Sequence, residues 1–312
     1  MKNKTLSFKI TDVIYILMMI LPLLCGMIIK ILTKPLSDGI SISGAQIYFT
    51  IPMPIQNLPI TESQVNSLFV TITILGLCLF LTHGLNEKIN TKRQLIAEGL
   101  VEQAENLTLN NMGQYFKGFG PFIGAILALS AFSSLITLLG LYPPTSDINI
   151  VGGWAILVFI LITYYKFKCG PIQYIKGFGD PVPFLAPLNI ISEVATPISM
   201  AFRHYGNILS GSVISILVAT GLQGLSKILL SWLPDWIANF PLLQIGLPAV
   251  LSIYFDVFSG LLQAYIFAML TMLYISGGFP AVEFEKRKLK KQNKLLNKNI
   301  GGNYRTRILI HR

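Results

Sequence analysis

The sequence predicts an all-α polytopic membrane protein with about six membrane helices, the last two long and strongly tilted. Three observations lead to this prediction. Hydrophobic residues make up 53% of the 312-residue chain and charged residues only 12%, and the mean hydropathy is +0.62. The apolar residues gather into six runs long enough to enter a bilayer core of about 30 Å. The charged residues gather between those runs and in the C-terminal tail.

The formal net charge of +10 is concentrated at one end of the chain. Residues 281–312 hold ten Lys or Arg against two Glu, which accounts for +8 of the total. A basic tail directly after an apolar run is typical of a cytoplasmic segment beside anionic lipid. Binding of RNA by this tail is the weaker alternative, so we expect a lipid bilayer and no nucleic acid as partner.

Cysteine and histidine are too scattered to form a metal site or a disulfide framework. Cys25, Cys78 and Cys169 are far apart, and so are the three histidines. We therefore expect no metal and no cofactor.

The first apolar run extends from Val13 to Leu32, after a segment with three lysines. A signal peptide is the alternative, but the run is longer than the usual signal core of about 7–15 residues and no small-residue cleavage site follows. We interpret it as a retained span. A proline-containing outer loop over 34–66 completes an N-terminal segment, 1–66. The channel-forming membrane domain is expected over 67–280 and the basic cytoplasmic tail over 281–312.

The next elements follow from alternating apolar and charged segments. A second span is expected over 67–85. The charged segment 86–114 has Ile96, Leu100 and Val101 at helical spacing, which favours a helix lying in the membrane interface. Spans three and four are expected over 119–141 and 150–165, joined by a tight turn at 142–147 that contains Pro143 and Pro144.

Spans five and six, over 188–225 and 242–276, are too long for a perpendicular crossing. At about 1.5 Å per residue they would reach roughly 50–57 Å, against a bilayer core of about 30 Å. They must therefore tilt strongly or break, for example at Pro197, Gly206 or Gly211. We also expect Gly206 and Gly211 to allow close helix approach.

The distribution of Lys and Arg predicts the orientation. The segments 1–10, 86–117, 166–176 and the tail hold nearly all of them, whereas the opposite loops hold only Lys30, Lys34 and Lys227. The positive-inside rule therefore places both termini in the cytoplasm.

A polar stripe runs along span five, with Arg203 within it. Its members recur at spacings of three and four residues and share one helix face: Ser192, Thr196, Ser199, Arg203, Asn207 and Ser210. A guanidinium at membrane depth costs about 2.5–3.5 kcal/mol on insertion scales, and it cannot deprotonate to escape that cost. A second stripe on span six holds Ser252, Asp256, Ser259 and Gln263.

The stripes predict two polar routes that approach one fixed cation from opposite faces. Glu193 and Ser199 lie on the cytoplasmic side of Arg203, whereas Ser210, Ser212 and Asp256 lie on the outer side. The alternative for Arg203 is a structural ion pair with Glu193 or Asp256. Glu193 could equally line the inner route or extend to the interface. The serines could simply bond to a carbonyl one turn back, and we expect His204, which points off the stripe, to pack or to contact a neighbouring subunit.

These residues resemble a known family. The stretch from Pro197 to Gly211 (Pro-Ile-Ser-Met-Ala-Phe-Arg-His-Tyr-Gly-Asn-Ile-Leu-Ser-Gly) resembles the signature of subunit a of the F-type ATP synthase. Gln263-Ala-Tyr-Ile-Phe resembles its last-helix motif, and Leu-Leu-Gly-Leu-Tyr-Pro and Pro-Thr-Ser-Asp-Ile-Asn over 138–149 also fit. The sequence departs from the family pattern at His204-Tyr205, where the family has Leu-Phe, and at Ser212, where it commonly has Glu.

The resemblance implies a role for each of these residues. The last two helices would form a hairpin against a ring of c subunits, with Arg203 facing the ring. Gln263 would hold Arg203 in position, Asn207 would match the family's Asn, and Asp256 would serve the outer half-channel, as its sole carboxylate if Ser212 replaces the usual Glu. The expected proton pathway comprises Asp256, Gln263, Asn207, Ser199, Ser210, Glu193 and Ser212.

The resulting hypothesis is a proton-translocating stator subunit of a rotary ATP synthase in a bacterial plasma membrane. It implies the c ring and peripheral-stalk b subunits as partners, and no catalysis by this chain alone. The alternative is a secondary transporter with a central Arg that binds an anionic substrate. Transporters usually carry matching broken helices in two repeated halves, whereas the polar residues here lie in the last two spans.

Overall fold

The computed structural model describes residues 2–33, 44–54, 56–85, 91–169, 171–179, 182–230, 246, 250–251, 253–279, 285 and 289. Within these ranges the chain is almost entirely helical. The α-helices are α1 (Lys2–Thr33), α2 (Glu62–Thr82), α3 (Lys92–Met112), α4 (Gly120–Leu135), α5 (Ile148–Cys169), α6 (Pro171–Gly177), α7 (Ala186–Leu229) and α10 (Gly260–Gly277). The 3-10 helices are η1 (Gln114–Phe119), η2 (Ile136–Leu139), η3 (Pro144–Ser146) and η4 (Pro183–Leu185), and η6 (Ile253–Ser259) is a π-helix.

Six helical segments of the described chain are long and apolar enough to cross a membrane, which confirms the predicted fold class. They are Ile10–Thr33, Glu62–Thr82, Gln114–Leu139, Ile148–Lys168, Pro183–Leu229 and Ile253–Gly277. The second begins at Glu62, five residues before the predicted start, because Thr61 and Gln64 form a capping box there. Most of the predicted start of span six, over 242–249, lies outside the described residues, and so does nearly all of the basic tail.

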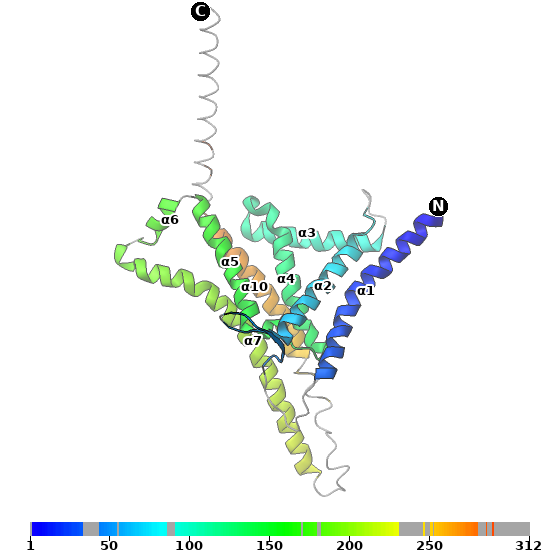
Figure 1. The fold of residues 1–312 in the computed structure, drawn as a ribbon. Coiled ribbons are helices and arrows are strands. Elements are labelled where there is room, and N and C mark those ends of the chain that lie inside the picture. Colours follow the sequence, from blue (N-terminus) through cyan, green and yellow to red (C-terminus); the bar gives the residue numbers. More distant parts are fainter. Residues whose placement is uncertain are drawn as a thin grey trace, which may run out of the picture.

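The helices form a layer with two distinct ends (Figure 1). One end, here called the N-terminal side, contains the start of α1, the surface helix α3 and the C-terminal ends of α5 and α10. The other end, here called the opposite side, contains the α4–α5 turn at η3. Helix α3 connects α2 to α4 across the N-terminal side, and its Leu95, Ile96, Leu100 and Val101 are exposed. This arrangement matches the interfacial helix that the sequence predicts.

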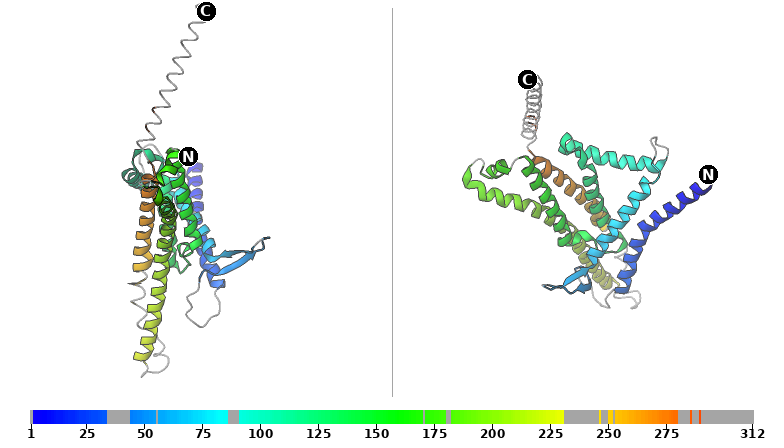
Figure 2. Two further views of the ribbon diagram at one scale, coloured as in Figure 1. Left: turned by 90° about the vertical axis from the view of Figure 1, so that its left-hand side faces the viewer. Right: turned by 45° about the horizontal axis from the view of Figure 1, so that its top comes forward.

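Two strands lie within the segment 34–66, which the sequence predicts as an outer loop. β1 (Ile47–Ile51) pairs antiparallel with β2 (Leu58–Thr61), with Ile47 opposite Thr61 and Ile51 opposite Leu58. The hairpin projects from the helical layer in the left view of Figure 2. The sequence analysis did not predict these strands. They form because Ile, Tyr, Phe and Thr favour extended structure, and the two strands leave Pro59 on a sheet edge.

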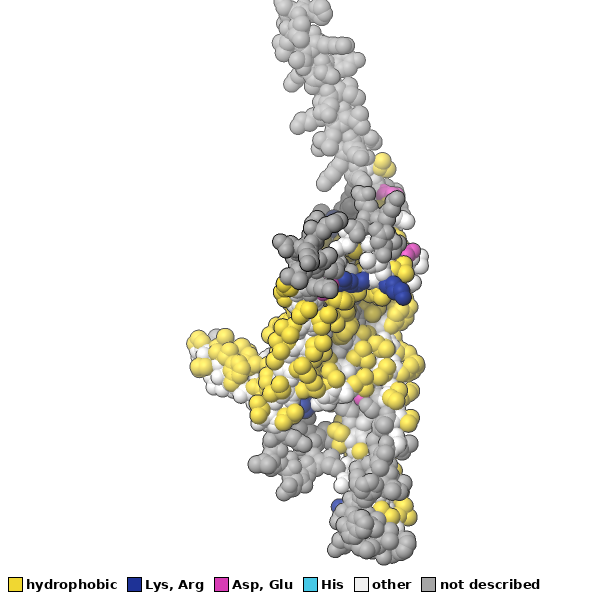
Figure 3. Space-filling view, turned by 90° about the vertical axis from the view of Figure 1, so that its right-hand side faces the viewer, with side chains coloured by type: hydrophobic (Ala, Val, Ile, Leu, Met, Phe, Trp, Pro, Cys, Tyr) yellow, Lys and Arg dark blue, Asp and Glu magenta, His cyan; other side chains and the backbone are white. Residues whose placement is uncertain are grey.

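Apolar side chains fill the centre of the layer and also cover its outside. A core of Phe116, Ile123, Val158, Phe267 and Met272 joins η1, α4, α5 and α10, and each of these side chains is at most 3% exposed. Figure 3 shows a broad hydrophobic band on the surface, with Lys or Arg side chains along its upper edge. An apolar surface band bordered by charge suits a protein surrounded by lipid.

Helix α7 is unbroken over 44 residues, with Pro197 inside it. At about 1.5 Å per residue it is about 66 Å long, roughly twice the bilayer core. Of the two predicted alternatives, a strong tilt or a break at Pro197, Gly206 or Gly211, the break does not occur. The helix instead runs obliquely and bends as it crosses the molecule (Figure 1).

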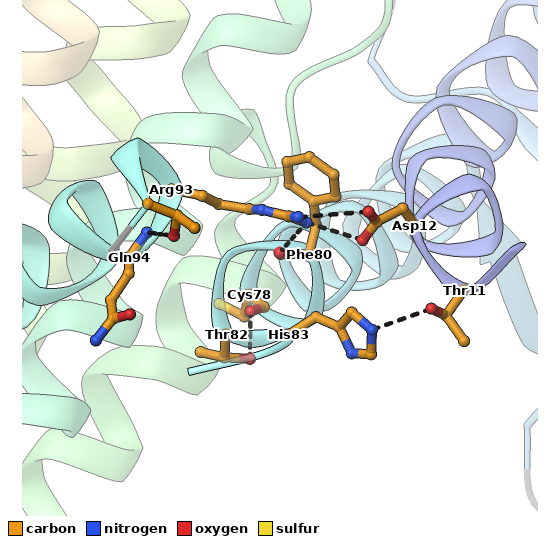
Figure 4. A network of polar contacts seen from close by, with 9 residues as sticks. Thr11, Asp12, Cys78, Phe80, Thr82, His83, Arg93 and Gln94 are labelled. Carbon is orange, nitrogen blue, oxygen red and sulfur yellow. Dashed lines mark hydrogen bonds and ion pairs between the residues drawn. The ribbon is translucent and has the colours of Figure 1, made fainter. Parts of the chain in front are cut away.

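The N-terminal helix α1 is joined to the rest of the bundle by a polar network on the N-terminal side (Figure 4). Arg93, at the start of α3, donates to both carboxylate oxygens of Asp12 at 2.8 and 3.3 Å, and also to the carbonyl of Phe80 at 3.1 Å. Thr11 hydrogen-bonds to the ring of His83 at 3.0 Å. One arginine therefore ties α1, α2 and α3 together.

Candidate functional site

The predicted polar stripe lies on one exposed face of α7. Ser192, Ser199, Arg203, Asn207 and Ser210 are all exposed. The other face is buried, with Met200 at 2%, His204 at 0% and Ile208 at 8% exposure. The stripe therefore points away from the chain's own bundle.

Arg203 forms no ion pair with any carboxylate in the described part of the chain. The alternative of a structural pair with Glu193 is wrong, because Glu193 binds Lys166 instead. Asp256 is also not within ion-pair distance of the guanidinium. An exposed arginine at membrane depth, with no carboxylate of its own chain beside it, remains available to an outside partner.

Asn207 and Gln263 connect the two helices close to Arg203. The amide nitrogen of Asn207 donates to the amide oxygen of Gln263 at 2.7 Å. Gln263 is only 1% exposed, and Asn207 lies one helical turn after Arg203. The family resemblance implies that Gln263 helps to hold Arg203. In the structure Gln263 accepts from Asn207, which lies on the same face of α7 as Arg203.

Two glycines allow the close approach on which this contact depends. A Cβ atom at Gly211 would lie 3.0 Å from the ring of Phe255, and one at Gly260 would lie 2.6 Å from Ser134. Small residues at such crossings are typical of packed membrane helices. The prediction for Gly211 is confirmed. At Gly206 an added Cβ would meet no described atom of this chain within 4 Å, so close approach there stays a prediction.

Asp256 lies in the π-helix η6, which comes directly before α10. Asp256 is therefore further than Gln263 from the N-terminal side. Its side chain is half-buried, and η6 contacts both α4 and α7. π-helical turns occur frequently at functional sites. The sequence predicts a regular helix here and gives no signal for the wider turn. Ser252, the first member of the second stripe, lies outside the described residues.

Three hydroxyl groups on or next to the α7 stripe bond to their own helix. Thr196 donates to the carbonyl of Ser192 at 2.9 Å, Ser210 to that of Asn207 at 3.2 Å, and Ser212 to that of Leu209 at 2.8 Å. This is the usual role of such hydroxyls in membrane helices. Among the stripe hydroxyls, those of Ser192 and Ser199 have no such bond to a described residue.

Glu193 belongs to a polar cluster at the N-terminal side. One carboxylate oxygen accepts from the Lys166 amine at 2.7 Å and from the Tyr174 hydroxyl at 2.9 Å. The side chains of Lys166 and Glu193 are 25% and 13% exposed. Burial, followed by the bond to Glu193, raises the pKa of Tyr174 to about 12. The cluster borders a cavity of about 220 Å³, which is also lined by Thr196 and Tyr274.

His204 is packed inside the bundle, as the sequence predicts for a residue off the stripe. One ring nitrogen lies 3.2 Å from the Ser130 hydroxyl, and the ring contacts Trp154 and Phe267 at centroid distances of 6.2 and 5.4 Å. It therefore joins α4, α5, α7 and α10. Its buried position fixes the rotation of α7, which leaves the adjacent Arg203 on the exposed face.

A second polar cluster, which the sequence did not predict, lies at the opposite side. Glu62 is 3% exposed; it pairs with Lys30 at 3.3 Å and accepts from the backbone of Tyr142 at 3.3 Å. Ser63 donates to Asp147. Two carboxylates, Glu62 and Asp147, therefore lie at this end of the molecule. An acidic residue directly before an apolar run was the only sequence signal, and it does not reveal the partners.

The fold and these clusters define a class: a polytopic helical membrane protein that carries polar groups into the apolar layer on its last two spans. A family model described as ATP synthase A chain matches residues 65–276. The chain therefore belongs to this family, the F-type ATP synthase subunits a, which are ion-translocating components of the membrane sector. The helix α1 precedes the matched region.

Individual relatives agree with the family match. An ATP synthase subunit a of Legionella pneumophila is 26% identical over 235 residues, which cover 75% of this chain and 93% of that protein. ATP synthase subunit a 1 of Crocosphaera subtropica is 30% identical over 68% of this chain and 83% of its own. A protein of Propionigenium modestum, named ATP synthase subunit a, sodium ion specific, is 24% identical over 78% of this chain and 88% of its own.

Proposed function

We propose that this chain is the proton-translocating stator subunit of a rotary F-type ATP synthase. It supplies two offset half-channels to a ring of c subunits, and Arg203 separates them. The observation that carries this proposal is the exposed Arg203, which has no carboxylate of its own chain within ion-pair distance in the described ranges. A cation that costs about 2.5–3.5 kcal/mol to insert needs a function or a partner, and the face that holds it points away from the bundle.

The two half-channels begin at the polar clusters on either side of Arg203. The inner one starts at the cavity beside Glu193 and Thr196 and continues past Ser199. The outer one passes Asp256, Ser210 and Ser212. The N-terminal side is cytoplasmic in this proposal, because Lys92, Arg93, Lys117, Lys166, Lys168 and Lys176 all belong to elements that meet there. Both termini are then cytoplasmic, in a bacterial plasma membrane.

The chemistry follows from the charge of Arg203. A carboxylic acid that reaches the arginine releases its proton, because a nearby cation favours the ionised form. The released proton leaves through one half-channel, and the carboxylate takes up another from the other half-channel after it has moved past. Asn207 and Gln263 hold α7 and α10 in register at this point. The peripheral-stalk b subunits keep the chain from rotating with the ring.

The test uses the complete synthase reconstituted into liposomes with Arg203→Ala and Arg203→Lys. We expect Arg203→Ala to abolish ATP-driven proton pumping and ATP synthesis. We expect Arg203→Lys to retain at most a small fraction of both, because an ammonium is a more compact and more strongly hydrated charge than a guanidinium. Full pumping and full synthesis in the alanine variant would disprove the proposal. Repeating the measurement with sodium in place of a proton gradient tests the coupling ion separately.

A further inference from the structure

The cavity at the N-terminal side has a charged residue in its wall that the half-channel proposal does not require. Lys166, near the end of α5, lines the cavity together with Glu193 and Thr196 of α7 and Tyr274 of α10. An ammonium beside a proton route is unexpected, because it repels the ion that has to enter. Any role of Lys166 in ion transport rests on the proposed function, in which this cavity opens to the cytoplasm.

The contacts of Lys166 make it a partner of Glu193. Its amine lies 2.7 Å from one carboxylate oxygen of Glu193, and the Tyr174 hydroxyl donates to the same oxygen at 2.9 Å. The amine also lies 5.7 Å from the centre of the Tyr174 ring. One oxygen of Glu193 therefore receives both donors. Within the described ranges neither of these donors bonds to the other oxygen, and Glu193 remains part of the cavity wall.

The groups around Glu193 come from three elements besides its own helix. They are Lys166 of α5, Tyr174 of α6 and Tyr274 of α10, of which Lys166 alone is a cation. Tyr174 keeps its proton at any physiological pH, because burial and Glu193 itself raise its pKa to about 12. The charge that acts on Glu193 from the described part of the chain is therefore that of Lys166.

We propose that Lys166 is a positioning residue of the inner half-channel, which holds Glu193 oriented at the cavity wall so that Glu193 exchanges protons with the cytoplasm. A proton from water in the cavity binds to the second oxygen of Glu193 and gives the neutral acid. The acid later releases that proton toward the ring carboxylate and returns to the carboxylate form. Lys166 and Tyr174 keep their own protons throughout.

The chain offers a matched control for this proposal. Lys168 lies two residues further along α5, carries the same charge, and lies over the rings of Tyr164 and Tyr165 at 5.9 and 5.6 Å. It does not line the cavity. Lys168→Met therefore removes the same charge from the same end of the helix without touching Glu193.

The experiment measures ATP-driven acidification of inverted membrane vesicles that contain the complete synthase, as a function of the pH on the cytoplasmic face. We expect Lys166→Met to shift the pH profile of pumping away from that of wild type, because Glu193 loses the donor that holds one of its oxygens at the cavity wall. We expect both Lys166→Arg and Lys168→Met to keep the wild-type pH profile. In a Glu193→Gln background, Lys166→Met should no longer shift the profile.

Several outcomes would overturn the inference. The inference fails if Lys166→Met has a wild-type profile, and it fails if Lys166→Met and Lys168→Met shift the profile equally. A lower amount of assembled synthase with an unchanged profile per complex would show that Lys166 only joins α5 to α7, and this too would overturn it. Arg203→Ala measured in parallel separates the two proposals: if it abolishes pumping while Lys166→Met behaves as wild type, only the role of Lys166 fails.

Discussion

Two arginines have opposite environments in this protein. Arg93 donates to Asp12 with both terminal nitrogens and to the carbonyl of Phe80 (Figure 4), and its guanidinium lies 4.4 Å from the centre of the Phe80 ring. Its side chain is 22% exposed. Arg203 is exposed and has no carboxylate from the described part of its own chain beside it. The same side chain is therefore neutralised within the fold in one place and left for a partner in the other.

The difference between the two arginines indicates that Arg93 stabilises the fold, whereas Arg203 serves the function. Arg93 contributes to the fold because its donors and its charge are satisfied by three helices of the same chain. Arg203 contributes nothing comparable to the isolated chain, and its insertion is unfavourable. The comparison therefore predicts that the two arginines respond to substitution in opposite ways.

The largest effect is expected at Arg203. Arg203→Ala should lower ATP-driven pumping by at least about 100-fold, the scale on which loss of a preorganised charge acts. The free energy of unfolding should not fall, because the substitution removes a costly charge from the apolar layer. Pumping per assembled complex and thermal unfolding in detergent measure the two quantities. A clear loss of stability would show that Arg203 has a structural partner.

Arg93→Ala should have the reverse effect. It leaves Asp12 without its partner, so we expect the free energy of unfolding to fall by about 1–3 kcal/mol, less than for a fully buried pair. Pumping per assembled complex should stay within about twofold of wild type. Arg93→Lys is the control, since it keeps the charge but loses the two-point contact. If Arg93→Ala lowered pumping as much as Arg203→Ala, the comparison would be invalid.

A smaller effect is expected for Gln263→Leu, which removes the bond to Asn207 but keeps a similar volume. Intramembrane hydrogen bonds contribute about 0.6–2 kcal/mol, so pumping should fall about fivefold if the bond keeps Arg203 in place. Gln263→Glu, whose side chain can still accept a hydrogen bond from Asn207, should lose less pumping activity than Gln263→Leu. Equal pumping in wild type and Gln263→Leu would exclude this role.

The smallest effect concerns Tyr174 and appears only at alkaline pH. Because its pKa is raised from 10.0 to about 12, folding favours the protonated hydroxyl. The stabilisation is complete below about pH 10 and is lost as the pH rises toward 12. Ultraviolet titration should show one fewer late-titrating tyrosine in Tyr174→Phe than in wild type. Loss of an early-titrating tyrosine instead would contradict the buried contact with Glu193.

Local sequence signals predicted the spans and the polar stripe, but they did not predict which side chains pair with one another. The apolar runs gave all six spans, because the cost of burying charge in lipid restricts composition over about 20 consecutive residues. Helical spacing placed Arg203, Asn207 and Ser210 on one face. The strands at 47–51 and 58–61 and the π-helix at 253–259 were missed. The strands and the π-helix depend on short-range backbone preferences, which the apolar composition of these segments does not reveal.

The sequence by itself determined that this chain crosses a membrane repeatedly and carries a fixed positive charge on a polar stripe, because periodicity and hydropathy are properties of neighbouring residues. Only the tertiary structure decided which charges neutralise one another. Arg93 and Asp12 are 81 positions apart and Lys166 and Glu193 are 27 apart. No local pattern shows that Arg93 is paired, or that Arg203 has no carboxylate beside it in the described ranges. Charge pairing depends on distance in space, and the packing of the helices sets that distance.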